Sequence, residues 1–327
     1  MTRASPTLFL DEACVLSLVT MEDALQAVEE VFGEESRGGV FNVPRVRAPL
    51  KSGVLRITAG ILSYRGYYGI KVTSSAVFGK STGRTFYLYR EETGDLCAIM
   101  QAFGLSTLRT GAASGIASKY LANEKAAVLG VLGSGRQAVT QVEAICRVLP
   151  IRQVRVFSPT ELHRERFCRD IARKLDVKAV PVAHAELAVR ESDVIVAATT
   201  SKTPVVCGQW LAPGAHVNAI GANHESRREL DREAVVNATF IATDDLEQVR
   251  YEAADIFDRV NEGVLAWEQV YSLADVVARR ISGRSSPADI TIFKSLGVAT
   301  EDVALAVQAY ERAVERKVGQ PLPAVTG

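Results

Sequence analysis

A glycine-rich turn near the middle of the chain holds the residues whose types and spacing most clearly suggest chemistry. An apolar run over residues 126–132 is followed by Gly133-Ser134-Gly135-Arg136-Gln137-Ala138. The first glycine of such a turn permits a tight bend, the second lets the backbone approach a pyrophosphate, and a small residue such as Ala138 lets the next helix pack on the strand. The amides of that helix's first turn then face the phosphates. The motif predicts a dinucleotide site, although similar glycine spacing also occurs in turns that bind nothing.

The residue that would meet the adenosine ribose indicates which dinucleotide is preferred. Sites for NAD normally place an Asp or Glu about 20 residues past the glycines, at the end of the second strand. Here the strand over residues 153–157 is followed by Ser158 and Thr160, and Arg164 comes shortly after. Hydroxyls and positive charge suit a 2′-phosphate, so we expect NADP(H) to be favoured over NAD(H). Glu161 points weakly the other way, and Arg164 is also explained as part of an exposed helix face.

Lys71 is the first candidate for acid–base chemistry. It lies in the strand-like segment 69–73 among apolar neighbours, where an ammonium is costly unless it faces a site or a partner. We interpret it as an acid, a base or a carboxylate ligand, and an edge-strand lysine turned to solvent is the alternative.

Three arginines are candidate ligands for a substrate carboxylate. Arg109 lies at the head of a helix of small side chains, and Arg45 and Arg47 follow Pro44. A guanidinium fork matches a carboxylate, although for any one of these arginines taken alone a surface position is the more common explanation.

Two further segments follow predicted strands of a parallel sheet, at the edge where ligands collect. Hydroxyl side chains at Thr199, Thr200 and Ser201 suit the nicotinamide ribose. After the next strand comes Gly221, and Asn223 or His224 could reach the reacting centre, although His224 could also face solvent. The four histidines are dispersed without ligand spacing, so we expect no metal site.

Composition limits the classes of partner. The 327 residues contain 38 basic and 38 acidic side chains, which gives a net charge of zero. No overall field therefore favours nucleic acid or an anionic membrane, and partners should be small molecules or copies of the chain itself. The five cysteines are scattered without paired spacing, and no apolar run is long enough for a membrane span. We expect a cytoplasmic protein.

The elements that must position these residues fall into two parts. A helix over about residues 21–35 is followed by a largely antiparallel β region to about residue 100, and then a helix over 105–121. Beyond the glycine turn, strands and helices alternate, which indicates a doubly wound parallel sheet. A last amphipathic helix over about 303–314 should pack back on the first part. The expected fold is therefore α/β, a Rossmann sheet plus a discontinuous α+β domain. Residues 121–301 would form the Rossmann domain, and residues 1–120 and 302–327 would form the α+β domain.

Motifs along nearly the whole chain resemble those of the ornithine cyclodeaminase and mu-crystallin family. In order, they are Pro44-Arg45, Gly69-Ile70-Lys71-Val72, Leu108-Arg109-Thr110-Gly111-Ala112-Ala113, the glycine turn, Gly221-Ala222-Asn223 with Arg228-Glu229-Leu230, and Phe293-Lys294-Ser295-Leu296-Gly297. The resemblance implies a homodimer, in which Arg45 and Arg109 hold the substrate carboxylate and Lys71 lies beside the reacting carbon. Arg47 stays an alternative to Arg45.

One departure from the family pattern favours a particular reaction. Where cyclodeaminases carry an aspartate after Gly-Ala, this chain has Asn223, and an amide cannot ionise for acid–base work. We therefore expect an NAD(P)H-dependent reductase of 2-imino acids, or the reverse amino-acid dehydrogenase. A cyclodeaminase that retains its NAD and a mu-crystallin-like NADP-dependent binding protein are the alternatives. The candidate catalytic residues are Lys71, Arg109, Arg45 and Asn223. The candidate cofactor-binding residues are Thr110, Gly133, Ser134, Gly135, Arg136, Gln137, Ala138, Ser158, Thr160, Arg164, Thr199, Thr200, Ser201 and Gly221.

Overall fold

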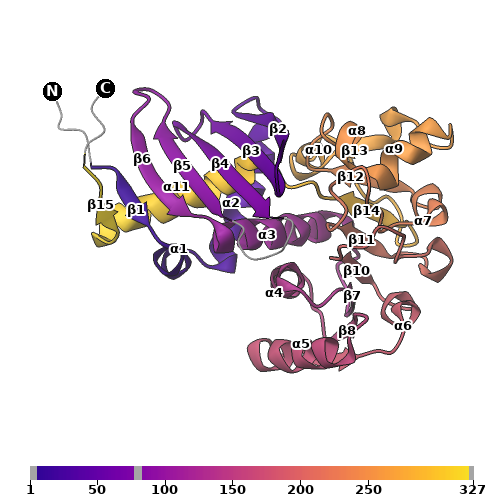
Figure 1. Ribbon diagram of the computed structural model, residues 1–327. Helices are drawn as coiled ribbons and strands as arrows, with labels where there is room; N and C mark the ends of the chain where they lie inside the picture. The colour runs from indigo at the N-terminus through magenta and orange to yellow at the C-terminus, as the bar shows by residue number, and fades with distance from the viewer. Residues whose placement is uncertain (1–5, 77–82, 324–327) are drawn as a thin grey trace. The chain divides into compact units, whose positions relative to one another are not determined.

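The computed structural model describes residues 6–76 and 83–323 of the chain (Figure 1). These residues form two compact units. Unit 1 is Met1–Arg109 with Val298–Gly327, and unit 2 is Thr110–Gly297. Each unit contains its own sheet, and the expected α/β class is confirmed.

Unit 1 contains a mixed sheet, which has seven strands among the described residues. Its order is β15-β1-β6-β5-β4-β3-β2. Strands β2 to β6 pair antiparallel, as their β-branched and aromatic residues predict, whereas β1 pairs parallel with β6. The bounds are β1 Leu8–Leu10, β2 Val40–Leu50, β3 Gly53–Leu62, β4 Tyr67–Ala76, β5 Arg84–Arg90, β6 Leu96–Gln101 and β15 Gln320–Pro321.

Helices cover one face of this sheet. They are α1 Glu12–Leu18, α2 Met21–Glu35 and α11 Ala299–Arg316. A capping box of Thr20 and Asp23 begins α2, as its sequence predicts. The closing helix α11 packs on α2 and on strands β3 and β4, so the prediction that it returns to the first part of the chain is confirmed (Figure 1). Strands β1 and β15 and helix α1 were not predicted.

Unit 2 contains a parallel sheet of eight strands in the described ranges, with the order β13-β12-β14-β11-β10-β7-β8-β9. The run β9-β8-β7-β10-β11-β14 has the strand order of a doubly wound dinucleotide-binding sheet. All of these strands are parallel, and the order in which the chain adds them changes side between β7 and β10. The bounds are β7 Val128–Leu132, β8 Gln153–Phe157, β9 Lys178–Pro181, β10 Val194–Ala197, β11 His216–Ala219, β12 Phe240–Thr243, β13 Val270–Ser272 and β14 Thr291–Lys294.

Strands β10, β11, β12 and β14 are buried at every residue, as in a parallel sheet that is covered on both faces. Of these four strands, β10 is a continuous apolar run, whereas the others also contain polar residues, among them His216, Asn218 and Lys294. Two apolar clusters pack against this sheet. The connecting helices are α3 Phe103–Leu121, which begins in unit 1, and α4 Arg136–Val148, α5 Glu161–Lys174, α6 Ala185–Val189, α7 Arg232–Val236, α8 Val249–Glu252, α9 Ala254–Asn261 and α10 Leu273–Val277, with short 3-10 turns at Gly208–Trp210 and Trp267–Gln269. Within the described ranges, none of the helices has both the length and the hydropathy that a membrane crossing needs.

Candidate functional site

The glycine turn has the local geometry that its sequence predicts. Strand β7 ends at Leu132, Gly133 has a φ of +107°, and α4 begins at Arg136 with Gly135 as its N-cap. A Cβ at Gly133 would lie 2.5 Å from the carbonyl oxygen of Ala198, so both the backbone angle and the space require glycine. No atom lies within 4 Å of where a Cβ at Gly135 would be, which leaves the start of α4 approachable from outside. This strand–turn–helix fits a bound pyrophosphate.

The end of β8 presents hydroxyls and an arginine to the same turn. Ser158 is buried, and its Oγ lies 2.9 Å from Ser134 Oγ. Arg164, on α5, donates from Nη1 to the carbonyl oxygen of Ser158 at 3.1 Å, and only 12% of its side chain is exposed. Thr160 is the N-cap of α5 and is exposed. The structure therefore brings Ser134, Ser158 and Arg164 together and keeps Arg164 off the solvated helix face.

The segments after β10 and β11 are joined by a residue to which the sequence analysis gave no role of its own. Glu229 is fully buried, and its carboxylate accepts hydrogen bonds from Thr199 and from the backbone of Gly221 and Ala222. Behind it, buried Asp255 pairs with buried Lys294. We call Glu229, Asp255 and Lys294 the Glu229 cluster. Glu229 and Lys294 each lie in one of the sequence motifs and Asp255 lies on α9, but nothing in the sequence shows that the three meet.

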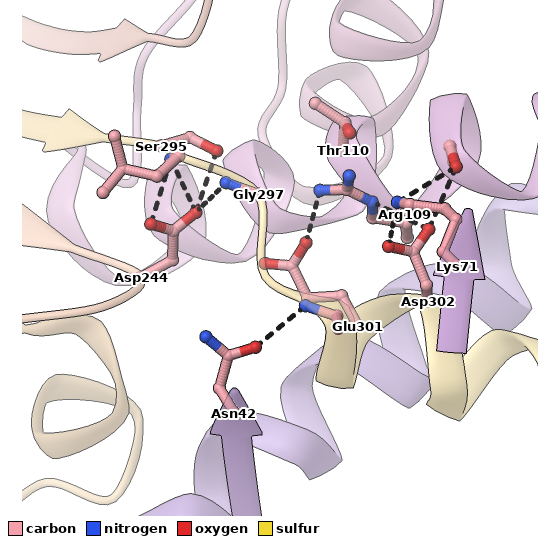
Figure 2. Close-up of polar contacts among 12 residues, drawn as sticks. Asn42, Lys71, Arg109, Thr110, Asp244, Ser295, Gly297, Glu301 and Asp302 are labelled. Atoms are coloured by element: carbon pink, nitrogen blue, oxygen red, sulfur yellow. Dashed lines mark hydrogen bonds and ion pairs between the residues drawn. The ribbon is translucent and has the colours of Figure 1, made fainter. Parts of the chain in front are cut away.

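Lys71 lies on β4, which is an interior strand of the unit 1 sheet, so the alternative of an edge-strand lysine is wrong. Only 8% of the residue is exposed. It faces the helix-covered side of the sheet, where its ammonium hydrogen-bonds Asp302 and approaches Ser106 Oγ at 3.4 Å (Figure 2). An ammonium at this depth is stabilised by its partner carboxylate.

Two consecutive carboxylates on α11 complete the arrangement around Lys71. Arg109 donates from Nη1 to Glu301 at 2.9 Å and from Nε to Asp302 at 3.3 Å, and Ser106 Oγ donates to Asp302 at 3.0 Å (Figure 2). Both carboxylates are fully buried. We call Lys71, Ser106, Arg109, Glu301 and Asp302 the Lys71 cluster. It holds two cations and two anions, whereas the sequence analysis singled out only the cations.

The first turn of α11 is held against the sheet by its backbone. A Cβ at Gly60 would lie 2.8 Å from the amide nitrogen of Thr300, so glycine allows the helix to approach β3. From β2, Asn42 Oδ1 accepts the amide hydrogen of Ala299 at 3.0 Å (Figure 2). These contacts fix the position of the first turn of α11, which carries Glu301 and Asp302.

The two candidate arginines on β2 differ in their position relative to Lys71. Val43 pairs with Ala59 and Val46 with Ile57, so the bulged residues Pro44 and Arg45 both lie opposite Thr58. Thr58 in turn pairs with Lys71, whereas Arg47 lies opposite Arg56, two rows further along the sheet. Of the two arginines, Arg45 therefore occupies the row of Lys71.

Burial lowers the pKa of Lys71 to about 8. The positive charges of Arg109 and Arg45 act in the same direction, and Asp302 opposes them. Burial alone would raise the pKa of Asp302, but Arg109 and Lys71 hold it below its ordinary value. The cluster thus pairs a carboxylate that stays ionised with an ammonium that can lose its proton near neutral pH.

The remaining candidates belong to neither cluster. Thr110 is buried on α3, and its carbonyl oxygen accepts a hydrogen bond from Gln141. Asn223 is half-buried after β11, and His224 is engaged locally, with Nδ1 2.9 Å from Ser226 Oγ. Among the described residues, no group of three or more His, Cys, Asp or Glu side chains is placed to hold a metal ion.

The chain is similar to known proteins over nearly its whole length. A model of the ornithine cyclodeaminase/mu-crystallin family matches residues 6–317. An alanine dehydrogenase from Archaeoglobus fulgidus is 37% identical over 325 residues, which cover 97% of this chain and 98% of that protein.

Two solved structures share the fold. An archaeal alanine dehydrogenase dimer with bound NAD has a TM-score of 0.92 at 37% identity and covers 98% of this chain and 99% of its own. The Delta(1)-pyrroline-2-carboxylate reductase of Thermococcus litoralis, in complex with NADH and L-proline, has a TM-score of 0.92 at 32% identity and covers 97% of this chain and 100% of its own.

Proposed function

Because the chain belongs to the ornithine cyclodeaminase/mu-crystallin family, we propose that it is a nicotinamide-dependent oxidoreductase acting on the C–N bond of a small amino or imino acid. The observation that carries this proposal is the Lys71 cluster, in which a buried lysine with a pKa of about 8 is held by an ionised carboxylate. Reversible chemistry at a C–N bond needs one group that can both give and take a proton at nitrogen. Lys71 meets that requirement.

The finer assignment is reduction of a 2-imino acid, cyclic or acyclic, to the L-amino acid, or the reverse dehydrogenation. Reduction of a preformed imine needs a bound carboxylate, a hydride donor and one proton source. Asn223 supports this reaction over cyclodeamination, because an amide cannot manage amine protons by ionising. Two similar proteins, a pyrroline-2-carboxylate reductase and an alanine dehydrogenase, are named for reactions of this kind.

A nicotinamide dinucleotide is the cofactor that the residues of unit 2 fit. Gly133 permits the tight turn and Gly135 leaves the backbone at the start of α4 open to a pyrophosphate, and Ser158, Thr160 and Arg164 would meet the adenosine ribose. Hydroxyls and a guanidinium at that position favour NADP(H) over NAD(H), because a 2′-phosphate would meet hydrogen-bond donors at the end of β8. Glu161, whose carboxylate lies 3.5 Å from Arg164 Nη2, acts against this preference. When bound, the nicotinamide would supply or accept the hydride.

The residues of unit 1 would orient the substrate and move the proton. Arg45 and Arg109 would bind the substrate carboxylate, since Arg45 lies in the row of Lys71 and Arg109 contacts the same Asp302. In reduction, the Lys71 ammonium would donate a proton to the imine nitrogen as the carbon accepts the hydride. In oxidation, neutral Lys71 would take that proton back from the amine. Asp302 would keep the ammonium in place through either direction.

The outer face of the unit 1 sheet supports a homodimer. Strand alternation turns one set of side chains toward α11 and the other set away from it. The second set is apolar and remains partly exposed, and Tyr68 and Tyr89 stack there with ring centroids 4.9 Å apart. Its members include Leu55, Ile57, Ile61, Tyr68, Ile70, Val72, Tyr87 and Tyr89. A second copy of the chain would cover this face, with residues 1–120 and 302–327 for substrate and dimer contacts and 121–301 for the cofactor.

A coupled assay tests the proposed function. Purified protein is mixed with NADPH or NADH and a panel of cyclic and acyclic 2-imino acids, and absorbance of the reduced nicotinamide is followed. We expect consumption that is faster with NADPH, and a loss of at least about 100-fold in Lys71→Met. Lys178→Met, at an exposed strand lysine, is the matched control and should retain activity.

Other outcomes would replace the proposal. Release of ammonia from ornithine or lysine without net change in the nicotinamide would identify a cyclodeaminase. Tight dinucleotide binding without either reaction would identify a binding protein.

A further inference from the structure

The carboxylate of Glu229 divides its two oxygens between two loops of unit 2. Oε1 accepts from the Thr199 amide at 2.7 Å and from Thr199 Oγ1 at 2.8 Å. Oε2 accepts from the amides of Gly221 at 2.6 Å and Ala222 at 3.1 Å. Thr199 follows β10 and Gly221 follows β11, so one side chain connects the ends of two neighbouring strands through four donors.

Glu229 is itself held by buried groups on the side away from these loops. Its amide donates to Asp255 Oδ1 at 2.7 Å, and the Leu230 amide donates to the same oxygen at 3.0 Å. Asp255 Oδ2 lies 2.5 Å from Lys294 Nζ, and all three charged side chains are buried. Burying such groups is costly unless each is paired or hydrogen-bonded. Here Asp255 and Lys294 pair with each other, and the Glu229 carboxylate accepts four hydrogen bonds, although burial still raises its pKa to about 7. A loop with no role beyond connecting two strands would not need three buried charged side chains to hold it in place.

The two loops that Glu229 holds lie at the edge of the sheet where a dinucleotide would bind. In a doubly wound sheet the dinucleotide lies across the carboxyl edge, with its phosphates at the first strand and its two halves on either side of the point where the strand order reverses. Here that point lies between β7 and β10. The adenosine half would lie toward β8, and the other half would lie over the ends of β10 and β11, where Glu229 acts.

We propose that Glu229 is a positioning residue, which fixes the loops after β10 and β11 so that they fit the nicotinamide half of the dinucleotide. This inference rests on the proposed function, because it presumes that a nicotinamide dinucleotide is the ligand. It predicts that Glu229 affects one half of the cofactor and leaves the other half unaffected.

Glu229→Gln is the sharpest test, because glutamine has one carbonyl oxygen and one NH₂ group. The oxygen can serve one loop only, and the NH₂ group then faces the N–H donors of the other loop. The dissociation constant is measured by calorimetry for NADP⁺ and for 2′,5′-ADP, which carries the adenosine half alone. We expect the NADP⁺ constant to rise about tenfold and the 2′,5′-ADP constant to stay within about twofold. If the wild type prefers NAD⁺, the pair is NAD⁺ and ADP.

Asp244→Asn is the matched control. Asp244 is also fully buried in unit 2, and it accepts hydrogen bonds from Ser295 Oγ and from the amides of Leu296 and Gly297 (Figure 2). It connects the ends of β12 and β14, and among the described residues its carboxylate has no hydrogen bond to Thr199, Gly221 or Ala222. We expect Asp244→Asn to lower the melting temperature as Glu229→Gln does, with both dissociation constants unchanged.

The outcomes separate the inference from the proposed function. Equal weakening of both ligands by Glu229→Gln, or weakening of neither, would overturn the inference alone. Failure of the wild-type protein to bind any of the dinucleotides would overturn the proposed function and the inference together. If Glu229→Gln does not fold, Glu229→Asp gives the same comparison, because its shorter side chain cannot reach both loops.

Discussion

The Lys71 cluster and the Glu229 cluster are both buried and charged, but they use their carboxylates differently. In the Lys71 cluster, Asp302 and Glu301 face side chains, namely the ammonium of Lys71 and the guanidinium of Arg109. In the Glu229 cluster, Glu229 faces mainly backbone amides and Asp255 combines two amides with one ammonium.

This difference separates two tasks. A carboxylate that binds backbone amides fixes the path of the chain, and nothing in that contact is exchanged during a reaction. A carboxylate that binds an ammonium also sets how readily the ammonium gives up its proton. Under the proposed function, the Lys71 cluster would carry the proton chemistry and the Glu229 cluster would set the shape of the cofactor loops.

The largest expected effect comes from removing the charge that faces Lys71. Asp302→Asn should lower kcat/KM for imine reduction about 100-fold, because the ammonium loses its ion pair and its orientation. It should also lower the pKa of Lys71 further, which moves the alkaline limb of the pH profile to lower pH. Steady-state kinetics across pH measure both changes. Glu311→Gln, at a partly exposed carboxylate of the same helix, is the control, and an equal loss there would contradict the assignment.

A smaller effect is expected from displacing the helix that carries the carboxylates. Gly60→Ala places a Cβ 2.8 Å from the Thr300 amide nitrogen, and helix backbone cannot move aside cheaply. We expect a loss of about 2 kcal/mol in the free energy of unfolding, measured in urea, together with reduced activity. Gly33→Ala, in α2 with no atom within 4 Å of the new Cβ, should not destabilise the protein. Full stability in Gly60→Ala would show that α11 is not held by this contact.

The pH dependence of the two reaction directions should differ in sign. The pKa of Lys71 is lowered to about 8, so the ammonium predominates below that pH and the neutral amine above it. Reduction needs the ammonium, and its kcat/KM should fall about tenfold for each pH unit above the pKa. Oxidation needs the amine, and its kcat/KM should rise up to the same pH and then level off. Limbs of the same sign in both directions would argue against Lys71 as the proton carrier.

The smallest effect should come from an ion pair that belongs to neither cluster. Arg312 on α11 donates to both oxygens of Asp23 at 2.6 and 2.5 Å, and these bonds lower the pKa of Asp23 to about 2. Because the pKa is lower in the folded state, the stabilisation is present above the ordinary value of 3.8 and is lost as the pH falls through about 2. Arg312→Ala should cost about 1 kcal/mol at pH 7 in urea unfolding, with no change in kcat. A change in kcat would mean that this pair also positions Asp302.

Much of the fold could be predicted from local pattern. The Thr20 and Asp23 capping box, the alternating strands before residue 100 and the apolar runs of the parallel sheet each have a cause within a few residues. The short strands β1, β13 and β15 escaped prediction because their pairing partners, and not their own two or three residues, make them strands.

The residues of the candidate site also fall into those with a local sequence signal and those that depend on distant partners. Gly133, Gly135, Lys71 and Arg109 could be found from the sequence because a glycine turn and an isolated cation in an apolar segment are local signals. Glu301 and Asp302 carry no such signal, since acidic residues in the first turn of a helix are ordinary. Asp302 lies 231 residues from Lys71 along the chain, and only the packing of α11 on β3 and β4 brings them together. Glu229 becomes significant for the same reason, because the strand order of unit 2 places β10 and β11 side by side. Residue types and short spacing therefore determined the kinds of chemistry available, and the tertiary structure decided which charges face each other, because burial and pairing depend on contacts between distant segments.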